Sequence, residues 1–267
     1  MPGVERFRGR VAILTGATQG IGLSSARRLG VEGCKVVVSS RSQENVDTAV
    51  KELKNEGIEV SGIVCDQGQK EDRSKLIKHA IDTYGGFDCL FISAGANNHN
   101  GNLLTATEKQ FDHIFHMNVK SNFQLIQECV PVLAERGGGS ILTNATAGTY
   151  DPLQSVTKNL LLYSLSKLCL MSMSQQMAPT CFNRKIRLNC VVPGPIKTPF
   201  LMGGLTDVQM KSYEKLAGMS FTDDLTGRFG EPEEVASIVA FLLSDDASYI
   251  NGQCIVAAGG LPFTTFM

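Results

Sequence analysis

A tyrosine and a lysine four positions apart, Tyr163 and Lys167, are the residues of this sequence best suited to chemistry. They lie in the stretch Leu160–Met177, whose pattern predicts a helix, and their spacing places both side chains on one helical face. A lysine ammonium beside a phenol favours the phenolate and lowers the tyrosine pKa from about 10 toward neutral pH. The pair therefore predicts a general acid/base that exchanges a proton with an alcohol or a carbonyl oxygen.

Three glycines near the N-terminus, Gly16, Gly20 and Gly22, predict a phosphate-binding turn. They lie between a predicted strand and a predicted helix. Glycines there let the backbone turn tightly and approach a pyrophosphate, whose charge the helix N-terminus stabilises. Their spacing, GxxxGxG, differs from the commoner GxGxxG. We expect the neighbouring residues of this loop to contact the same dinucleotide, namely Thr15, Thr18, Gln19 and Ile21.

The end of the second predicted strand indicates which dinucleotide binds. An NAD site usually has an acidic residue there, which binds the ribose 2′-hydroxyl. The segment Val38-Ser39-Ser40-Arg41-Ser42 has none. Ser40 offers a hydroxyl and Arg41 a planar cation, both suited to a 2′-phosphate. We therefore predict NADP(H) rather than NAD(H) as the cofactor; the alternative is that Arg41 is a solvated loop arginine.

The elements that position these residues follow from an alternation of short apolar runs with longer helical patterns. The predicted strands are rich in Val, Ile and Leu, as in a parallel sheet buried on both faces: Arg10–Leu14, Lys35–Ser39, Ile58–Val64, Asp88–Ile92, Ser140–Asn144, Ile186–Val192 and Gln253–Ala257. The predicted helices are Gly22–Glu32, Asn45–Asn55, Lys70–Tyr84, Glu108–Glu135, Leu160–Met177 and Pro232–Leu243. Repeated βα units predict one α/β domain over residues 1–267, a seven-stranded parallel, doubly wound sheet with helices on both faces. Residues 198–227 show neither pattern and are predicted to form a mobile substrate-binding flap.

Composition excludes several classes of partner. The 267 residues include 25 basic and 26 acidic side chains, for a formal net charge of −1. This balance gives no electrostatic reason to expect nucleic acid or an anionic membrane as a partner. No apolar run reaches about 18 residues, so we expect no membrane span.

The cysteines and histidines lack the spacings of a metal site. No two of the eight cysteines form a CxxC pair, and the four histidines have no HExxH pattern around them. We therefore expect free thiols, a reducing compartment and no bound metal. The first residues lack the apolar core of a signal peptide, and Thr265-Phe266-Met267 is not a peroxisomal address. These observations predict a cytoplasmic protein.

Together, the glycine loop and the Tyr163–Lys167 pair make the sequence resemble a short-chain dehydrogenase/reductase of the classical subgroup, over nearly its whole length. Further segments carry the same resemblance: Cys65-Asp66, Ala94-Gly95, Met117-Asn118-Val119-Lys120 and Pro193-Gly194-Pro195-Ile196-Lys197-Thr198. The resemblance implies that Asp66 contacts the adenine and that Asn118 holds a proton-relay water. It also implies that a group of residues contacts the nicotinamide side: Ala94, Gly95, Pro193, Gly194, Ile196 and Thr198.

The family's activity is implied by the same resemblance. It is reversible hydride transfer from NADPH to a ketone or aldehyde on a Rossmann fold. Within the family the sequence is similar to NADP-dependent carbonyl and retinal reductases, so dicarbonyls, quinones, retinal and steroids are the expected substrate classes. Tyr163 then donates the proton, Lys167 lowers its pKa and holds ribose hydroxyls, and Thr146 binds the carbonyl oxygen. A homo-tetramer, or a dimer, is implied as well.

Three departures from the family pattern bear on the site. Ser93 stands where the family's NNAG segment has its second asparagine, and a serine replaces only part of that hydrogen bonding. Thr146 stands at the catalytic serine position, where its β-branch restricts the rotamers of the hydroxyl. The stretch from Thr146 to Tyr163 is a few residues longer than usual, and it makes Thr149 a rival for the serine role.

Two alternatives share these motifs. The first is a 3-oxoacyl-carrier-protein reductase or a hydroxysteroid dehydrogenase, which would share all of these motifs. The second is a non-catalytic NADP(H)-binding protein, which the altered Ser93 and Thr146 and the longer loop favour. The intact Tyr163, Lys167 and Asn118 argue against this second alternative.

Overall fold

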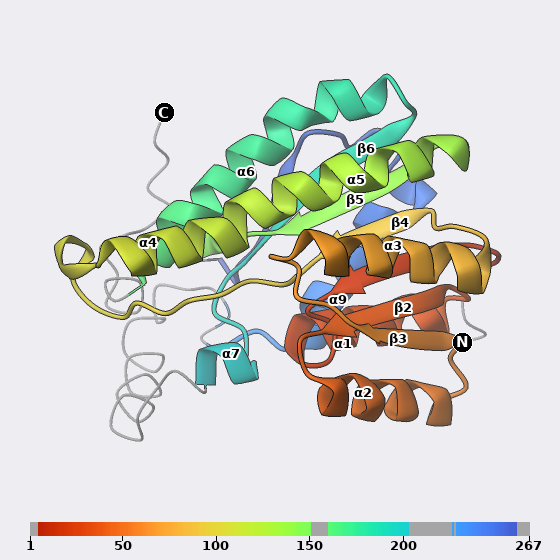
Figure 1. Ribbon diagram of the computed structural model, residues 1–267, viewed down its shortest axis with the longest axis horizontal. Coiled ribbons are helices and arrows are strands. Elements are labelled where there is room, and N and C mark those ends of the chain that lie inside the picture. The colour runs from red at the N-terminus through yellow and green to blue at the C-terminus, as the bar shows by residue number, and fades with distance from the viewer. Residues whose placement is uncertain (1–4, 151–159, 203–225, 227, 261–267) are drawn as a thin grey trace.

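A computed structural model describes residues 5–150, 160–202, 226 and 228–260 of the chain. Its centre is a seven-stranded parallel sheet in the order β3-β2-β1-β4-β5-β6-β7 (Figure 1). The strands are β1 (Val11–Thr15), β2 (Lys35–Ser40), β3 (Val60–Val64), β4 (Cys89–Ile92), β5 (Gly139–Asn144), β6 (Ile186–Pro193) and β7 (Cys254–Ala257). All seven strands predicted from sequence are confirmed, to within a few residues at their ends.

Apolar side chains on both faces of the sheet explain why these segments are strands. Every residue of β1 and of β4 is buried, so neither strand has a solvent face that would require alternating polar residues. One buried cluster joins Leu29, Leu53 and Val239 of α1, α2 and α9 to one face of the sheet. A second joins residues of α3, α5 and α6, such as Leu76 and Leu125, to the other face. The sheet is therefore the middle layer of three.

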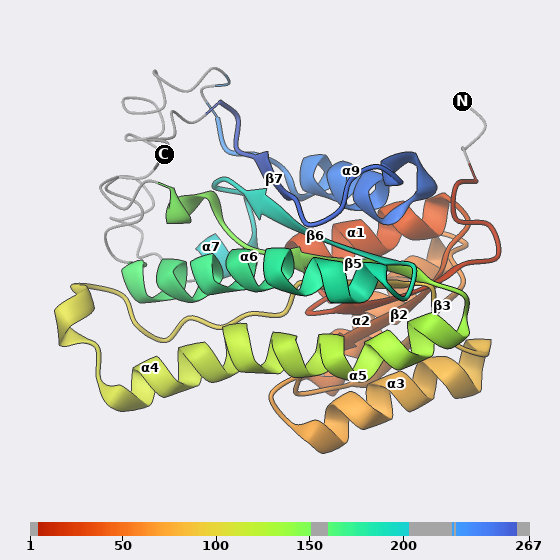
Figure 2. The ribbon, with the colours of Figure 1, turned by 90° about the horizontal axis from the view of Figure 1, so that it is seen from above.

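The helices that form the outer layers are α1 (Gly20–Val31), α2 (Gln43–Asn55), α3 (Lys70–Tyr84), α4 (Glu108–Phe115), α5 (Ser121–Glu135), α6 (Leu161–Phe182), α7 (Pro199–Met202) and α9 (Pro232–Leu243). Figure 2 shows α1 and α9 together on one side of the sheet and α3, α5 and α6 on the other. The predicted doubly wound architecture is thereby confirmed. No helix among the described residues is long and apolar enough to cross a membrane.

Two predicted helices differ from those in the structure. The predicted helix Glu108–Glu135 is interrupted by a π-helical turn, His116–Lys120, which separates α4 from α5. Such turns insert a residue into the helical ladder and frequently occur at functional sites. The predicted helix Leu160–Met177 continues to Phe182 and includes Pro179. Of the predicted flap, Thr198 and α7 are described, whereas residues 203–225 lie outside the described residues, as do 151–159 of the longer loop.

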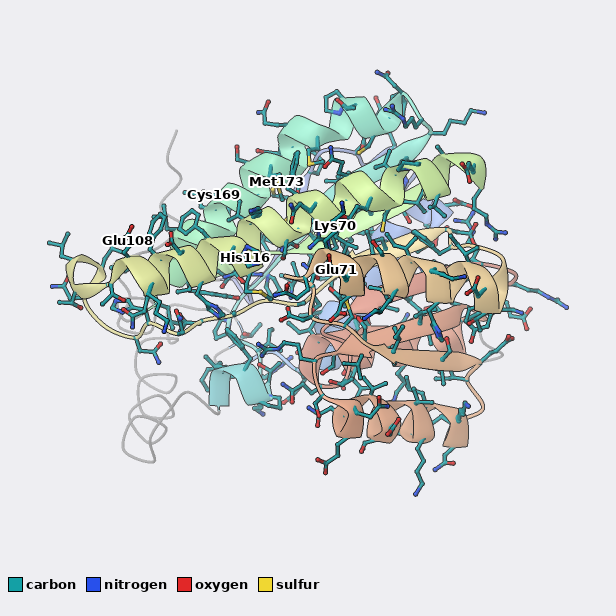
Figure 3. The ribbon with its side chains drawn as sticks, in the orientation of Figure 1. Lys70, Glu71, Glu108, His116, Cys169 and Met173 are labelled. Atoms are coloured by element: carbon teal, nitrogen blue, oxygen red, sulfur yellow. The ribbon has the colours of Figure 1, made fainter. Side chains whose placement is uncertain are left out.

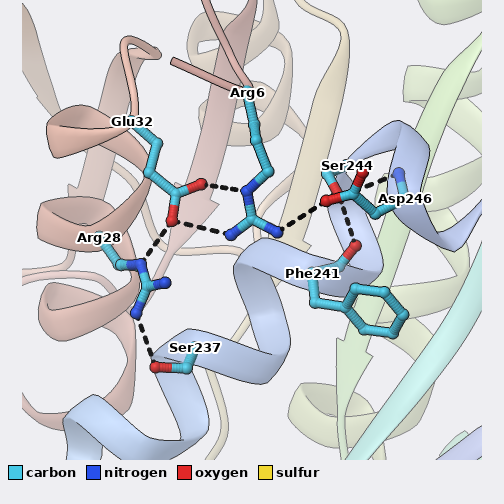
Figure 4. A network of polar contacts seen from close by, with 7 residues as sticks. All are labelled: Arg6, Arg28, Glu32, Ser237, Phe241, Ser244 and Asp246. Carbon is cyan, nitrogen blue, oxygen red and sulfur yellow. Dashed lines mark hydrogen bonds and ion pairs between the residues drawn. The ribbon is translucent and has the colours of Figure 1, made fainter. Parts of the chain in front are cut away.

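A network of ion pairs ties the N-terminal segment to distant parts of the fold (Figure 4). The Arg6 guanidinium donates to Glu32, just after α1, at 2.6 and 2.8 Å, and to Asp246 at 3.1 Å. Arg28 of α1 donates to the same Glu32 at 2.5 Å and to Ser237 of α9 at 2.8 Å. These contacts hold α1 against α9.

The strand order reverses beside β1. β1 pairs with β2 on one side and with β4 on the other. The chain therefore continues from β1 to β2 toward one edge of the sheet, and from β4 to β5 toward the other edge. In open α/β sheets, ligands bind outside the carboxyl ends of the strands at such a switch point. The fold therefore predicts a binding cleft next to Thr15 and Ile92, where β1 and β4 end.

Candidate active site

A cleft of about 380 Å³ opens at this edge of the sheet. It is lined from the loops that follow β1 to β6 and from α6. Most of the predicted site residues line it: Thr15, Gly16, Thr18, Gln19, Gly20, Ile21, Gly22, Ser40, Arg41, Ala94, Gly95, Thr146, Tyr163, Lys167, Pro193, Gly194, Ile196 and Thr198. Two predicted residues, Asp66 and Asn118, are not among the lining residues.

The loop between β1 and α1 forms a cradle that only glycines allow. Gly16 and Gly20 have φ angles of +60° and +52°, a region that side chains disfavour. A Cβ on Gly22 would lie 2.3 Å from the carbonyl oxygen of Gly16, so a side chain there is excluded. Helix α1 starts at Gly20 with no side-chain cap and no acidic residue in its first turn. Its N-terminal N–H groups and dipole therefore suit an anion such as a pyrophosphate.

The end of β2 supplies an arginine to the cleft. Arg41 is exposed and lines the cleft together with Ser40, Ser42 and Asn45. Among the described residues, no carboxylate pairs with Arg41. Its guanidinium thus lies beside serine hydroxyls without a competing anion, an arrangement suited to a phosphate.

Tyr163 and Lys167 of α6 lie together at the opposite end of the cleft. The Lys167 ammonium lies 5.6 Å from the centre of the Tyr163 ring, and the same ring lies 5.4 Å from that of Phe200. Lys167 is 2 % exposed and donates to the main-chain carbonyl of Asn144 at 2.6 Å. The Tyr163 hydroxyl has no hydrogen-bond partner among the described residues and can donate to a ligand in the cleft.

Burial determines the protonation of both groups. Burial raises the pKa of Tyr163 above its ordinary value of 10, which is the opposite of the shift predicted from its spacing to Lys167. The prediction considered the charge of the lysine alone, whereas loss of solvent around the phenol determines the direction. Burial also lowers the pKa of Lys167 to about 8. At neutral pH the tyrosine is therefore a neutral proton donor beside a lysine ammonium.

Asn118, in the π-helical turn, lies behind this pair. Its Oδ1 accepts from the Ala96 N–H at 2.8 Å, and its Nδ2 donates to the Ala96 carbonyl and to Ser166 Oγ, each at 2.9 Å. A Cβ on Gly95 would lie 3.3 Å from both Asn118 Oδ1 and Lys167 Nζ, so Gly95 allows the close approach of these groups. The Asn118 carboxamide thus joins the loop after β4 to α6.

The two threonines that compete for the serine role have different surroundings. Thr146 lines the cleft, and its hydroxyl accepts from the Gly148 N–H at 3.3 Å. Thr149 is not among the lining residues, and its hydroxyl donates to the Thr146 carbonyl at 2.9 Å. Of the two hydroxyls, that of Thr146 is the one with access to a ligand.

Several residues of the cleft were not identified from sequence. Asn144 donates from Nδ2 to Ser93 Oγ at 3.3 Å, so an amide on β5 contacts the serine that replaces the family's asparagine. Its position as a polar residue at the carboxyl end of a buried strand was the available signal. Gln67 and Met117 also line the cleft, but they reach it through contacts between distant segments, which leave no pattern in the sequence. Among the described residues, no group of three or more His, Cys, Asp or Glu could hold a metal ion.

Comparisons with known proteins define the class. A family model described as enoyl-(acyl carrier protein) reductase matches residues 16–262. The chain belongs to the short-chain dehydrogenase/reductase (SDR) family of oxidoreductases, as the resemblance predicted. It is 43% identical over 262 residues to dehydrogenase/reductase SDR family member 4 of Sus scrofa, covering 97% of this chain and 90% of that protein. It is 40% identical over 264 residues to the human SDR family member 2, mitochondrial, covering 96% and 89%.

Solved structures agree with this class. A 7α-hydroxysteroid dehydrogenase complexed with NADH and 7-oxo glycochenodeoxycholic acid matches with a TM-score of 0.87 and 28% identity, covering 96% of both chains. L-sorbose reductase from Gluconobacter frateurii, complexed with NADPH and L-sorbose, matches with a TM-score of 0.85 and 28% identity, covering 97% of this chain and 98% of that one. These two neighbours are complexed with NADH in one case and NADPH in the other, each together with a small organic molecule.

Proposed function

We propose that the protein is an NADPH-dependent oxidoreductase that reduces the carbonyl of a ketone or aldehyde, with Tyr163 as the general acid. One observation carries this proposal. A glycine cradle, an arginine and a tyrosine–lysine pair line the same cleft, and no carboxylate of the described residues pairs with the arginine. The cradle follows β1, the arginine follows β2 and the tyrosine–lysine pair lies on α6. Phosphate binding and proton donation are thereby available at the two ends of one site.

The residues present fit a dinucleotide phosphate. The loop of Gly16, Gly20 and Gly22 would hold the pyrophosphate, because a Cβ on Gly22 would collide with the Gly16 carbonyl. Arg41 would bind the 2′-phosphate. Residues after β4 and β6 would line the nicotinamide half, namely Ala94, Gly95, Pro193, Gly194, Ile196 and Thr198. When bound, NADPH would supply the hydride for the carbonyl carbon.

The chain's own residues would handle the proton. Tyr163 donates its hydroxyl proton to the substrate oxygen as negative charge develops there. The Lys167 ammonium, 5.6 Å from the ring centre, stabilises the phenolate that remains. The Thr146 hydroxyl donates to the same substrate oxygen and orients the carbonyl. Asn118 would position its neighbours, because its carboxamide is hydrogen-bonded to Ala96 and Ser166.

The apolar side of the cleft favours a carbonyl attached to an apolar body. Leu160, Pro199, Phe200 and Leu201 line the cleft, and Phe200 packs 5.4 Å from the Tyr163 ring. This surface suits aromatic ketones, quinones, retinal or steroids more than a small polar sugar. The rest of the predicted flap lies outside the described residues.

The test is a screen for NADPH oxidation with diketones, quinones, retinal, steroids and acyl thioesters, run on the wild type and on Tyr163→Phe. We expect turnover with an apolar carbonyl, and we expect Tyr163→Phe to abolish it while NADPH still binds. Reduction by the variant at the wild-type rate would exclude Tyr163 as the acid. Activity on acyl thioesters alone would favour an acyl-carrier-protein reductase, and binding without any turnover would favour a non-catalytic protein.

We also infer that residues 1–267 form one domain and that the chain assembles as a homo-tetramer or a dimer. The outer surface of α5 and α6 supports the second point, because Phe123 and Leu168 are 44% and 47% exposed there. Figure 3 labels Cys169 and Met173 on α6, and His116 in the π-helical turn that precedes α5. A second subunit would bury this apolar surface. A cytoplasmic location remains our proposal from the sequence.

A further inference from the structure

Cys190 and Cys254 lie opposite each other on two neighbouring strands of the sheet. Their Cα atoms are partners where β6 lies parallel to β7 (Figure 2), and the Cys190 N–H donates to the Gln253 carbonyl at 2.8 Å. Because side chains alternate between the faces of a sheet, such partners point to the same face. Cys190 belongs to a buried cluster with Ala145 and Met171, and Cys254 packs against that cluster. The two thiols are therefore neighbours on the face that α6 covers.

The two thiols differ in their access to solvent. Cys190 is fully buried. Cys254 is partly exposed, because β7 is the edge strand of the sheet and every residue of β7 is partly exposed. All eight cysteines lie within the described residues, and among them Cys169 is the only other one that is partly exposed. A reagent in solution therefore reaches Cys254 and not Cys190.

The contact between the two thiols makes the exposed one the more acidic. A hydrogen bond from the Cys190 thiol lowers the pKa of Cys254 below its ordinary value of 9.0, against the opposing effect of burial. Burial, together with the neighbouring Cys254, raises the pKa of Cys190 well above that value. The thiolate is the nucleophilic form of cysteine. The partly exposed sulfur is thus the reactive one, and the buried thiol beside it stays protonated.

The backbone allows a covalent bond between the two sulfur atoms. Neighbouring strands lie about 4.8 Å apart, and the Cα atoms of disulfide-bonded cysteines usually lie about 4.4–6.8 Å apart. Partnered residues of β6 and β7 fall within that range. A disulfide between Cys190 and Cys254 therefore does not require the strands to separate.

We propose that Cys190 and Cys254 form a site of reversible oxidation by hydrogen peroxide, at which Cys254 reacts first and Cys190 resolves the product. The Cys254 sulfur attacks one peroxide oxygen. An S–O bond forms, the O–O bond breaks, and the other oxygen leaves as water with the thiol proton, which gives a sulfenic acid. The Cys190 sulfur then attacks the Cys254 sulfur, and the hydroxyl leaves as water with the Cys190 proton. The two thiols lose two electrons, which reduce one peroxide to two waters.

The experiment treats the full chain, without cofactor or substrate, with a small molar excess of hydrogen peroxide. Free thiols are then alkylated in urea and counted by mass spectrometry, and digestion identifies the joined peptides. We expect the wild type to lose two of its eight thiols and to yield a peptide pair joined through Cys190 and Cys254. Dithiothreitol should restore both thiols, because a disulfide is reduced by thiol exchange.

Two variants separate the roles of the thiols. Cys190→Ala removes the resolving thiol, so Cys254 should stop at the sulfenic acid, which dimedone traps as an adduct. Cys254→Ala removes the reacting thiol, so Cys190 should stay reduced under the same conditions. Cys169→Ala is the matched control, because it removes the other partly exposed thiol and leaves the strand pair intact. It should form the same disulfide as the wild type.

Three results would overturn the inference. The first is a wild type that keeps all eight thiols or that stops at a sulfenic acid. The second is a disulfide that joins any other pair of cysteines. The third is oxidation of Cys190 in Cys254→Ala at the wild-type rate. Circular dichroism establishes that each variant is folded, and the wild-type measurement is decisive without the variants. No readout requires turnover, so the outcome is independent of the proposed function.

Discussion

Asn118 and Ser166 are joined by a hydrogen bond of 2.9 Å from Nδ2 to Oγ, and this bond links the π-helical turn to helix α6. Ser166 Oγ in turn donates to the main-chain carbonyl of Tyr163 at 2.6 Å. The relative position of the turn and the tyrosine is therefore set by a serine that does not itself line the cleft. Ser166 is thus a positioning residue in the proposed mechanism.

Replacing Ser166 with alanine should lower kcat and leave cofactor binding intact. The substitution leaves Asn118 with an unsatisfied donor and frees the Tyr163 turn of α6, so we expect kcat to fall about tenfold. The dissociation constant for NADPH should change less than about twofold, since Ser166 is outside the cleft. Steady-state kinetics and a binding titration test this. Ser172→Ala, at an exposed position of the same helix, should match the wild type in both.

Thr146 and Thr149 can be compared with one pair of substitutions. Thr146→Val removes the hydroxyl and keeps the side-chain shape, so we expect kcat to fall by about 10²-fold, as when an oxyanion donor is lost. Thr149→Val should lower kcat less than about threefold, because its hydroxyl bonds to the Thr146 carbonyl and not to the cleft. The reverse result would assign the serine role to Thr149.

Arg41→Ala should change the preference between cofactors. Loss of the guanidinium removes a charge-assisted contact with a 2′-phosphate, so NADPH binding should weaken about tenfold or more. NADH lacks this phosphate, and its affinity should change little. Titration with both cofactors measures the ratio. Lys51→Ala, which removes an exposed charge from the adjacent α2, is the control. Equal weakening of NADPH and NADH by Arg41→Ala would contradict the assignment.

Lys167 should make stability depend on pH above about 8. Burial lowers its pKa to about 8 from 10.5, so between these values the unfolded chain binds a proton that the native state has released. The contribution of Lys167 to the free energy of unfolding therefore rises with pH over this window. Lys167→Met lacks this contribution. Urea unfolding from pH 7 to 10 should show the wild type gaining stability relative to the variant, and parallel curves would disprove the prediction.

The outer surface of α5 and α6 should control assembly. Leu168→Glu places a charge on a surface that we propose a second subunit buries, so the variant should elute as a smaller species in size-exclusion chromatography with light scattering. Ile81→Glu is the control, because Ile81 is 41% exposed on α3, which is not part of the proposed interface. A wild type that is already monomeric would refute the assembly.

The strands and the glycine cradle were predictable from sequence because they depend on local patterns. The apolar runs of β1 and β4 and the spacing of Gly16, Gly20 and Gly22 need no knowledge of distant segments. The π-helical turn was not predictable, because the pattern of Glu108–Glu135 continues through it without a proline or glycine. The pKa of Tyr163 was predicted in the wrong direction, since spacing reveals a charged neighbour but not the loss of solvent.

Gln67 and Asn144 illustrate a second limit of predicting a site from the sequence. Each reaches the cleft through partners far away in the chain: Ser121 for the first, and Ser93 and Lys167 for the second. A motif search finds residues that recur at fixed spacings, and these contacts have none. For Asn144, the carboxyl end of a buried strand was the only sequence signal, and for Gln67 there was none, because the topology of the sheet and not the order of the chain makes these contacts.

The contact between Arg6 and Asp246 spans 240 positions of the chain. During synthesis, the arginine therefore leaves the ribosome 240 residues before the aspartate. The phosphate cradle lies at the start of α1, whose far end this arginine ties through Glu32 to the region after α9. A nascent chain therefore has its glycine loop and α1 long before α9 is available to pack against that helix. The packing of α1 against α9 can therefore form only after both of these distant segments have been synthesised.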